Sequence, residues 1–457
     1  MKAHKNWSYA PYRPPFIDCG DIYICRLVAL PTSIHLEWLS IGEETYEVFC
    51  RVRGGEDFAK VGETKACEFT IEGLTQESEY EFYVQVGKKK SRVRLARCGE
   101  VVGTVVNYLH PEDDVYAFSG RCLCSPSLVR HPDGYLLAAM DVFKGGYPQN
   151  LEIIFRSDDD GKTWHYVSEL FPCFWGKMFL HKGDLYMLGC STEYGDLLIG
   201  KSTDGGKTFT EPTVLFRGQN GKNGEVGVHK NPQPVVEHNG RLWNTMEWGS
   251  WGRGYHAVMV MSVPVDDDLL DADNWAFSEP VKYDPNWEGL PKGDSPGNIE
   301  GALVVRPDGF YNIMRYQMGN LTPNYGLILA YKVNTEDPEA PLTFDHAISF
   351  PANHSKFMIK QHPVTKKYYS VATRIIDADH SGSRNLLSLM VSEDCEHWEV
   401  ERDIYDYLEA DPQKVGFQYV DFEIEGDEII FLCRTAMNDA CNYHDSNYST
   451  FDRIKLK

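Results

Sequence analysis

The sequence predicts an all-β protein in which a small β-sandwich precedes a large, radially repeated sheet. Three observations lead to this prediction. Apolar and polar residues alternate with a period of two in the first hundred residues, six polar turns recur between residues 123 and 434, and one short turn motif occurs twice. We assign residues 1–103 to the sandwich and residues 104–457 to the repeated sheet, since 457 residues suffice for a small and a larger domain.

Residues 20–103 carry the alternation expected of half-buried strands. Residues 33–38 read Ser-Ile-His-Leu-Glu-Trp, and the same pattern returns over residues 46–52 and 79–86. In a sandwich of two sheets, each strand buries one face and exposes the other. These segments therefore predict a compact β-sandwich.

Six modules of strand, polar turn and strand follow. Their turns lie at residues 131–134, 181–184, 238–241, 306–309, 362–365 and 425–428. One four-stranded blade cannot bury its own faces, so hairpins repeated at roughly 45 to 70 residues indicate a β-propeller. We predict six blades, or seven if residues 105–120 and 262–298 contain further strands. Residues 105–109 are expected to complete the last blade and so close the ring.

A turn motif Ser-x-Asp-x-Gly-x-Thr-aromatic begins at Ser157 and again at Ser202, and a less complete copy begins at Ser392. Asp and Ser side chains can bond the amides of such a turn, and Gly accepts a positive φ. The aromatic side chain can fill the gap between neighbouring blades. We expect this motif to be structural, with no part in chemistry.

Composition limits the partners that the protein can have. The net charge of −22 disfavours nucleic acid and anionic membranes, so an anionic ligand would need a local basic pocket. No apolar run approaches the ~20 residues of a membrane span. No metal-binding motif, phosphate loop or dinucleotide fingerprint occurs, so we expect neither metal nor cofactor. The sequence leaves the oligomeric state open.

The twelve cysteines include no Cys-x-x-Cys pair, and the first residues lack the apolar segment of a signal peptide. Reduced thiols in the cytoplasm are the simplest explanation. The mature form of a secreted protein would give the same pattern, so this location is an expectation only.

In a propeller the innermost strands converge on a central channel, and polar residues at their starts face one cavity. We predict that four such residues are catalytic: His229, Glu247, Glu300 and Tyr419. Those predicted to bind substrate are Arg315, His354, Lys356, Arg384, Gln418, Asp421, Arg434, His444 and Asn447. The mixture of cations, carboxylates and histidines suits an oligosaccharide with an acidic sugar. Trp248 and Trp251 are candidates for a sugar-stacking platform or for core packing.

Several segments resemble known families. The motif at Ser157 and Ser202 resembles the Asp box, or BNR repeat, of sialidases. Residues 231–243, 299–309, 416–422 and 434–447 look like sialidase-like propellers grouped with ulvan lyases and rhamnosyl-glucuronate lyases or hydrolases, and the likeness covers nearly all of residues 120–457. Leu74 and Tyr80 after the Trp38 strand resemble a fibronectin type III domain, in which they pin a corner of the sandwich.

The resemblance implies an enzyme that cleaves a terminal linkage next to an acidic sugar, with rhamnose–glucuronate as one candidate. It leaves two chemistries open: a polysaccharide lyase or an exo-acting glycoside hydrolase. In β-elimination, His229, His354 or Tyr419 would act as base and acid while cations hold the uronate carboxylate. In hydrolysis, two of the carboxylates Glu247, Glu300 and Asp421 would flank the bond.

Two further alternatives are an exo-sialidase and a non-catalytic glycan-binding propeller. A sialidase fits less well, because Cys124-Ser125-Pro126-Ser127 stands where that family has Arg-Ile-Pro.

Overall fold

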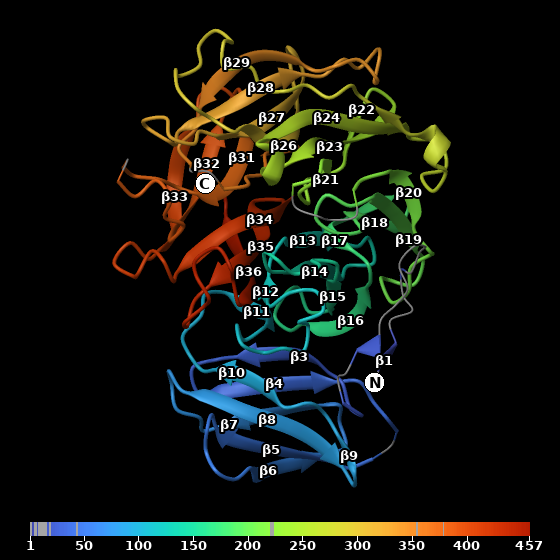
Figure 1. Ribbon diagram of the computed structural model, residues 1–457, viewed down its shortest axis with the longest axis vertical. Coiled ribbons are helices and arrows are strands. Elements are labelled where there is room, and N and C mark those ends of the chain that lie inside the picture. The colour runs from blue at the N-terminus through green and yellow to red at the C-terminus, as the bar shows by residue number, and fades with distance from the viewer. Residues whose placement is uncertain are drawn as a thin grey trace.

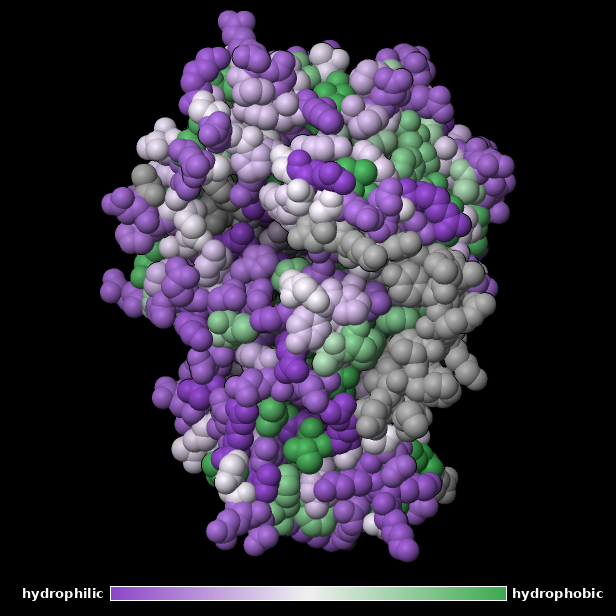
Figure 2. All heavy atoms as spheres, viewed as in Figure 1, coloured by the Kyte–Doolittle hydropathy of each residue, from purple (hydrophilic) through white to green (hydrophobic). Residues whose placement is uncertain are grey.

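The computed structural model describes residues 2, 3, 7, 16, 17, 20–42, 44–219, 224–352, 355–377 and 379–457. Its regular structure is almost entirely β, as the sequence predicts; two short 3-10 helices, η1 (Trp251–Arg253) and η2 (Ala272–Asn274), interrupt it. A blue sandwich lies at one end of the molecule and a larger body of sheets at the other (Figure 1). Hydrophilic residues predominate on the face shown in Figure 2. No helix in the described chain is long and apolar enough to cross a membrane.

Two antiparallel sheets form the N-terminal sandwich. One contains β3 (Ile24–Ala29), β4 (Ser33–Trp38) and β7 (Glu68–Glu72). The other contains β10 (Arg94–Arg97), β8 (Glu79–Val86), β5 (Tyr46–Val52), β6 (Ala59–Thr64) and β9 (Lys89–Lys90). Separately, β1 (Lys2–Ala3) pairs with β2 (Phe16–Ile17).

The predicted alternation is confirmed in β4, where every second side chain is buried. The Tyr80 hydroxyl accepts a hydrogen bond from the Thr75 amide at 2.8 Å. This bond fixes the chain where it leads into β8.

The remaining described residues form six sheets, which we call blades 1 to 6 and which each run from an inner to an outer strand. Blade 1 contains β12 (Cys122–Leu123), β13 (Ser127–Arg130), β14 (Leu136–Phe143), β15 (Glu152–Ser157) and β16 (His165–Leu170). Blade 2 contains β17 (Phe174–His181), β18 (Asp184–Cys190), β19 (Leu197–Ser202) and β20 (Thr213–Phe216). Blade 3 contains β21 (Gly227–His229), β22 (Val236–His238), β23 (Arg241–Ser250), β24 (Tyr255–Pro264) and β25 (Ala276–Phe277).

Blade 4 contains β26 (Gly297–Arg306), β27 (Gly309–Gln317), β28 (Leu327–Lys332) and β29 (Thr343–Ser349). Blade 5 contains β30 (Lys360–Gln361), β31 (Tyr368–Thr373), β32 (Leu386–Ser392) and β33 (Glu399–Asp406). Blade 6 contains β34 (Gly416–Glu425), β35 (Glu428–Ala436), β36 (Tyr448–Lys455) and, as its outer strand, β11 (Thr104–Tyr108).

Blade 6 is built from both ends of residues 104–457. β11 lies antiparallel to β36, with Thr104 opposite Phe451 and Tyr108 opposite Tyr448. The closing strand predicted from residues 105–109 is thereby confirmed. Pairing the two ends removes a free sheet edge, which is otherwise a site for aggregation.

The repeated motif shapes two turns in the way the sequence predicts. Asp159 accepts hydrogen bonds from the Thr163 amide and hydroxyl at 2.8 and 2.7 Å. Trp164 is fully buried and meets Phe451 of blade 6 edge to face, with ring centres 5.4 Å apart. In the second copy, Phe209 packs with residues of blade 1. Both aromatic side chains therefore fill gaps between neighbouring blades.

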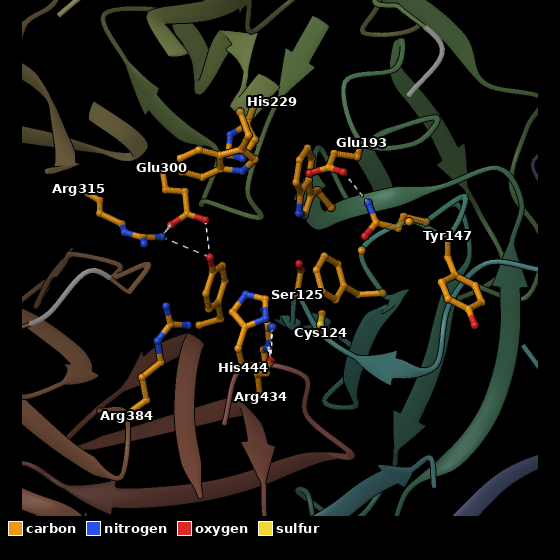
Figure 3. A pocket seen from close by; sticks show the side chains of 17 residues that line it. Cys124, Ser125, Tyr147, Glu193, His229, Glu300, Arg315, Arg384, Arg434 and His444 are labelled. Atoms are coloured by element: carbon orange, nitrogen blue, oxygen red, sulfur yellow. Dashed lines mark hydrogen bonds and ion pairs between the residues drawn. The ribbon is translucent and has the colours of Figure 1, made fainter. Parts of the chain in front are cut away.

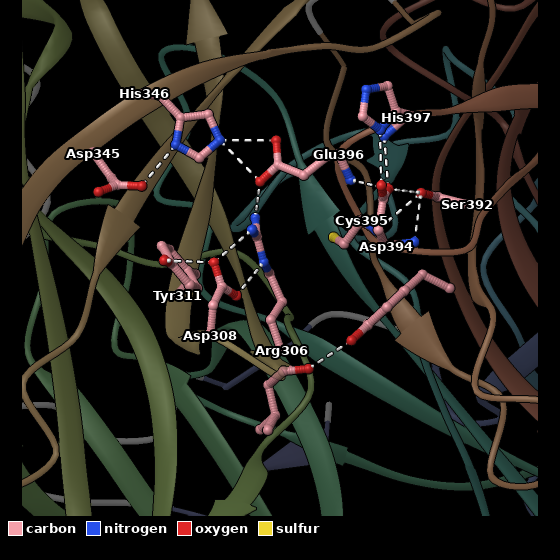
Figure 4. A network of polar contacts seen from close by, with 12 residues as sticks. Arg306, Asp308, Tyr311, Asp345, His346, Ser392, Asp394, Cys395, Glu396 and His397 are labelled. Carbon is pink, nitrogen blue, oxygen red and sulfur yellow. Dashed lines mark hydrogen bonds and ion pairs between the residues drawn. The ribbon is translucent and has the colours of Figure 1, made fainter.

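The third, less complete copy joins blades 5 and 4 (Figure 4). Asp394 accepts a hydrogen bond from the His397 amide at 2.9 Å. The next carboxylate, Glu396, contacts His346 Nε2 at 2.8 Å and forms an ion pair with Arg306. The turn keeps its bonding pattern although its residues have changed.

The sandwich is fixed to the propeller by buried polar contacts. Arg26 Nε donates to the Val106 carbonyl at 2.7 Å, and the Tyr23 hydroxyl donates to Glu169 at 2.7 Å. Arg94 and Asp113 form an ion pair of 2.5 Å that is almost completely buried. Buried pairs of this kind are costly to separate, because each leaves an uncompensated charge.

Candidate active site

A cavity of about 560 Å³ opens where the inner strands begin (Figure 3). This volume is typical of small-molecule sites. All six blades contribute to its walls. The lining residues are Cys124, Ser125, Phe143, Gly145, Gly146, Tyr147, Gln149, Trp175, Glu193, His229, Trp251, Glu300, Arg315, Arg384, Tyr419, Arg434 and His444. None of them comes from the sandwich.

Three of the lining side chains stand on equivalent β-bulges in alternate blades. The strand register skips two residues in β17, β26 and β34, and the first skipped residues are Trp175, Glu300 and Tyr419. Their φ angles are 53°, 57° and 56°. Such angles are uncommon for residues other than glycine and concentrate at functional sites. Each bulge directs one side chain into the cavity.

A buried charged side chain from the preceding blade holds the backbone of each bulge. Asp141 of blade 1 accepts from the Trp175 amide at 3.0 Å, and Glu247 of blade 3 accepts from the Gly301 amide at 3.4 Å. Lys356, at the start of blade 5, donates to the carbonyl of Val420 at 3.3 Å. All three charged side chains are fully buried. Burial raises the pKa of Asp141 to about 6 and lowers the pKa of Lys356 to about 8.

Glu300, Tyr419 and Arg315 form a tight cluster at the cavity wall. The Tyr419 hydroxyl donates to Glu300 Oε1 at 2.6 Å, and Arg315 lies 2.6 Å from Glu300 Oε2. Burial opposes ionisation of Glu300, but Arg315, His229 and the Tyr419 hydrogen bond together hold its pKa below the ordinary value. Burial and the charge of Glu300 raise the pKa of Tyr419 to about 12. Glu300 is therefore ionised and Tyr419 protonated near neutral pH.

His229 is paired with the carboxylate beneath it. Its Nδ1 lies 2.6 Å from Glu247 Oε2, and both side chains are buried. A carboxylate ion only accepts hydrogen bonds, so Nδ1 carries the proton. This leaves Nε2 of His229 as the nitrogen available to a ligand.

Three arginines make one wall of the cavity cationic. Arg384 donates to the Gln418 side chain, and Arg434 Nε donates to the His444 carbonyl at 3.0 Å. The guanidinium of Arg434 lies 4.8 Å from the centre of the Tyr419 ring. Burial lowers the pKa of Arg384 to about 10, which leaves it charged at neutral pH. With Arg315, these residues form a basic pocket in a chain of net charge −22.

The opposite wall carries Glu193 and several aromatic residues. In Figure 3, Glu193 and Tyr147 lie on the far side of the cavity from Arg315 and Arg384. Gln149 Nε2 donates to Glu193 Oε2 at 2.8 Å. Burial raises the pKa of Glu193, and His229 and Gln149 only partly oppose this. Two carboxylic acids with opposite pKa shifts thus share one cavity.

Seven of the predicted site residues line the cavity: His229, Glu300, Tyr419, Arg315, Arg384, Arg434 and His444. Glu247 and Lys356 lie beneath it and hold the bulges. Three other predicted residues do not line it: Gln418, Asp421 and Asn447. Gln418 contacts Arg384, Asp421 pairs with the buried Lys177, and Asn447 bonds the backbone of Met437. His354 lies outside the described residues.

Four residues that line the cavity are not predicted from the sequence: Tyr147, Gln149, Trp175 and Glu193. They lie on connecting loops or on a bulge, where no periodic pattern marks them. Of the two tryptophans singled out from the sequence, Trp251 lines the cavity. Trp248 instead packs against Phe216, with ring centres 5.6 Å apart. The described residues contain no group of three or more His, Cys, Asp or Glu that could hold a metal ion.

No protein-family model and no curated protein matches the chain. Among solved structures, an α-L-arabinanase of Penicillium chrysogenum complexed with arabinobiose is 16% identical, with a TM-score of 0.51 over 78% of this chain and 98% of that one. A variant α-L-arabinofuranosidase of Fusarium graminearum with an iminosugar inhibitor is 14% identical, with a TM-score of 0.50 over 77% and 97%. An ulvan lyase bound to -[GlcA(1-4)Rha3S]- aligns over 97% of this chain and 95% of its own at 10% identity, with a TM-score of 0.44. The first two likenesses show a shared fold.

Proposed function

We propose that the chain is a carbohydrate-active enzyme that hydrolyses a terminal linkage next to an acidic sugar. The observation that carries this proposal is the Tyr419–Glu300 hydrogen bond of 2.6 Å in a cavity lined by three arginines. A hydroxyl beside an ionised carboxylate is the usual arrangement of an activated nucleophile. The proposed sialidase-like ancestry agrees with the fold shared with glycoside hydrolases.

The arginines account for the acidic sugar. A guanidinium offers parallel N–H donors that match the two oxygens of a carboxylate. Arg315 is paired with the carboxylate of Glu300, whereas the bonds of Arg384 to the Gln418 amide and of Arg434 to the His444 carbonyl are made to neutral groups, so Arg384 and Arg434 are the proposed ligands of the sugar carboxylate. Because Arg434 lies 4.8 Å from the centre of the Tyr419 ring, a carboxylate bound there would hold the anomeric carbon near the Tyr419 hydroxyl. Desolvation of the cavity strengthens these contacts.

The two carboxylates then have separate roles. Tyr419 Oη attacks the anomeric carbon while its proton passes to Glu300 Oε1. Glu193, whose pKa is raised by burial, is the proposed acid and gives a proton to the departing glycosidic oxygen. A water molecule, deprotonated by Glu193, then breaks the bond to Tyr419, and Tyr419 recovers its proton from Glu300. The net reaction is hydrolysis.

The His229–Glu247 pair favours β-elimination as a second candidate. Held by Glu247, His229 Nε2 could remove the proton α to a uronate carboxylate while the arginines stabilise the developing charge. Tyr419 would protonate the departing oxygen at C4. Elimination adds no water and leaves a conjugated uronate.

A panel of rhamnose–glucuronate oligosaccharides and a sialoside tests both chemistries. Hydrolysis predicts new reducing ends without new ultraviolet absorbance, whereas elimination predicts both. Glu300→Gln and Tyr419→Phe should each abolish turnover by hydrolysis, and His229→Gln should abolish elimination. Binding of the panel without any cleavage would instead identify a glycan-binding propeller.

The N-terminal sandwich and the cysteines carry two further proposals. The bond between Tyr80 and Thr75 supports the view that residues 1–103 are a fibronectin type III-like domain, acting as a spacer. Eleven cysteines of the described chain are free, which supports a reducing, cytoplasmic location. Limited proteolysis near residue 103 and fractionation of the source cells would test these two proposals.

A further inference from the structure

The cavity has two walls of different chemistry. All three arginines that line it come from blades 4, 5 and 6. The wall from blades 1, 2 and 3 holds no arginine or lysine among the lining residues, and it carries the carboxylate Glu193. A second anionic sugar would find no cation there. An uncharged group fits this wall better.

Trp251 gives that wall an exposed aromatic surface. Its side chain is 42% exposed, and it is the one aromatic residue among the large hydrophobic side chains that are exposed in the described chain. Such exposure has a cost, which binding of an apolar surface would relieve. The position is fixed: the Trp251 amide donates to the Tyr194 hydroxyl at 3.0 Å, and Ser250 caps the short helix η1.

Gln149 adds a polar group that needs a partner. Its side chain is 2% exposed, and its Oε1 has no hydrogen-bond partner among the described residues. Its Nε2 is committed to Glu193 at 2.8 Å, which fixes the orientation of the amide. A buried acceptor left unpaired destabilises the protein. A hydroxyl donor from a ligand would satisfy it.

We infer that this wall, formed by Trp251, Trp175, Tyr147 and Gln149, is a second subsite that binds a neutral sugar as the leaving group. One face of a neutral sugar ring presents C–H groups that pack on Trp251, and a hydroxyl of the same ring donates to Gln149 Oε1. The inference rests on the proposed function and adds which sugar lies on which wall of the cavity. The acidic sugar occupies the arginine wall, Glu193 meets the linking oxygen, and the neutral sugar departs.

Binding to a Glu300→Gln variant tests the subsite without turnover. The probes are glucuronate, a glucuronosyl-rhamnose disaccharide, and the corresponding sialic acid and sialyl-galactose pair, titrated by calorimetry. We expect a disaccharide to bind more tightly than its acidic monosaccharide. Adding Trp251→Ala should weaken disaccharide binding about tenfold and leave monosaccharide binding unchanged. Trp251→Phe should retain most of the affinity.

Controls separate this inference from the proposed reaction. Val364→Ala, at an 80% exposed turn residue, should change neither affinity. Three results would overturn the subsite. Trp251→Ala could lower the affinity for disaccharide and monosaccharide equally, it could lower neither affinity, or no probe could bind at all. If the wild-type protein cleaves a disaccharide and Trp251→Ala binds it normally, the subsite alone is refuted. If Trp251→Ala discriminates as expected but the wild type cleaves neither disaccharide, the proposed reaction fails and the subsite stands.

Discussion

At one end of the strands of the blades the chain makes regular turns, whereas at the other end three inner strands bulge into the cavity. The turn end repeats one set of local bonds, such as Asp159 to Thr163, and its aromatic residues seal the blades. At the cavity end, Trp175, Glu300 and Tyr419 adopt left-handed backbone conformations that neighbouring blades must hold in place. The comparison teaches that this protein separates stability and chemistry along the same strands.

The largest expected effect is the loss of activity on changing Glu300. Glu300→Gln keeps the shape of the side chain but removes the base, so kcat/KM should fall by about 10²–10⁴-fold in steady-state assays. The variant also leaves the buried guanidinium of Arg315 without its carboxylate partner, so its melting temperature should fall and activity is compared at a temperature where both proteins are folded. The matched control is Glu396→Gln at the turn end, which should retain full activity. A large loss of activity in that control would contradict the proposed separation of stabilising residues from catalytic ones.

Trp164→Ala should lower stability and, in contrast to Glu300→Gln, leave activity intact. Removing a fully buried tryptophan between blades 1 and 6 should lower the free energy of unfolding by about 3–5 kcal/mol in urea titrations. The activity of the folded fraction should persist, because Trp164 does not line the cavity. The exposed Trp251 offers the comparison: its replacement by Ala should cost far less stability. A lower kcat in folded Trp164→Ala would show that the two ends are coupled.

Lys356→Met tests the support of a bulge. The variant removes the hydrogen bond to the Val420 carbonyl while filling a similar volume, so Tyr419 should lose its fixed position. A shift of about 1 Å can cost roughly 10²-fold in rate, and we expect a lower kcat with a similar KM. Stability should be unchanged or higher, because a buried charge is removed. Lys360→Met, at a partly exposed ion pair with Glu423, is the control.

The smallest expected effect is a difference in pH dependence. Burial raises the pKa of Asp141 from 3.8 to about 6, so its contribution to stability is fully present below pH 3.8 and is lost as the pH rises to about 6. Asp159 at the turn has a pKa of about 2, since hydrogen bonds from Thr163 and Ser157 outweigh the effect of burial. Its contribution is present above pH 3.8 and is lost as the pH falls toward 2.

Denaturation curves across this pH range would measure both contributions. Asp141→Asn should remove the loss of stability between pH 3.8 and 6, and Asp159→Asn should remove the loss below pH 3.8. If both variants kept the wild-type profile, neither carboxyl would behave as its surroundings indicate.

The same contrast explains what the sequence could predict. The turns are local, so the motif at Ser157 and the alternation at Ser33–Trp38 are sufficient to predict them. The sequence could predict that Glu300, Tyr419 and the arginines face the cavity, because they lie on the inner strands or on the strands paired with them. The sequence could not predict Glu193 and Gln149, because their loops reach the cavity only when the blades are arranged around it. Asp421 does not line the cavity but pairs with Lys177 of blade 2, a partner that nothing local in the sequence reveals.

The strand β11 also has a consequence for the order of folding. Its partner β36 follows all the other blade strands in the sequence, so the ring cannot close until residues 448–455 have been synthesised. Two contacts of β11 do not depend on β36: Arg26 Nε donates to the Val106 carbonyl, and the Leu27 amide donates to Asn107 Oδ1. Residues 20–103 are synthesised before this strand, so the sandwich can hold β11 before β36 covers its edge.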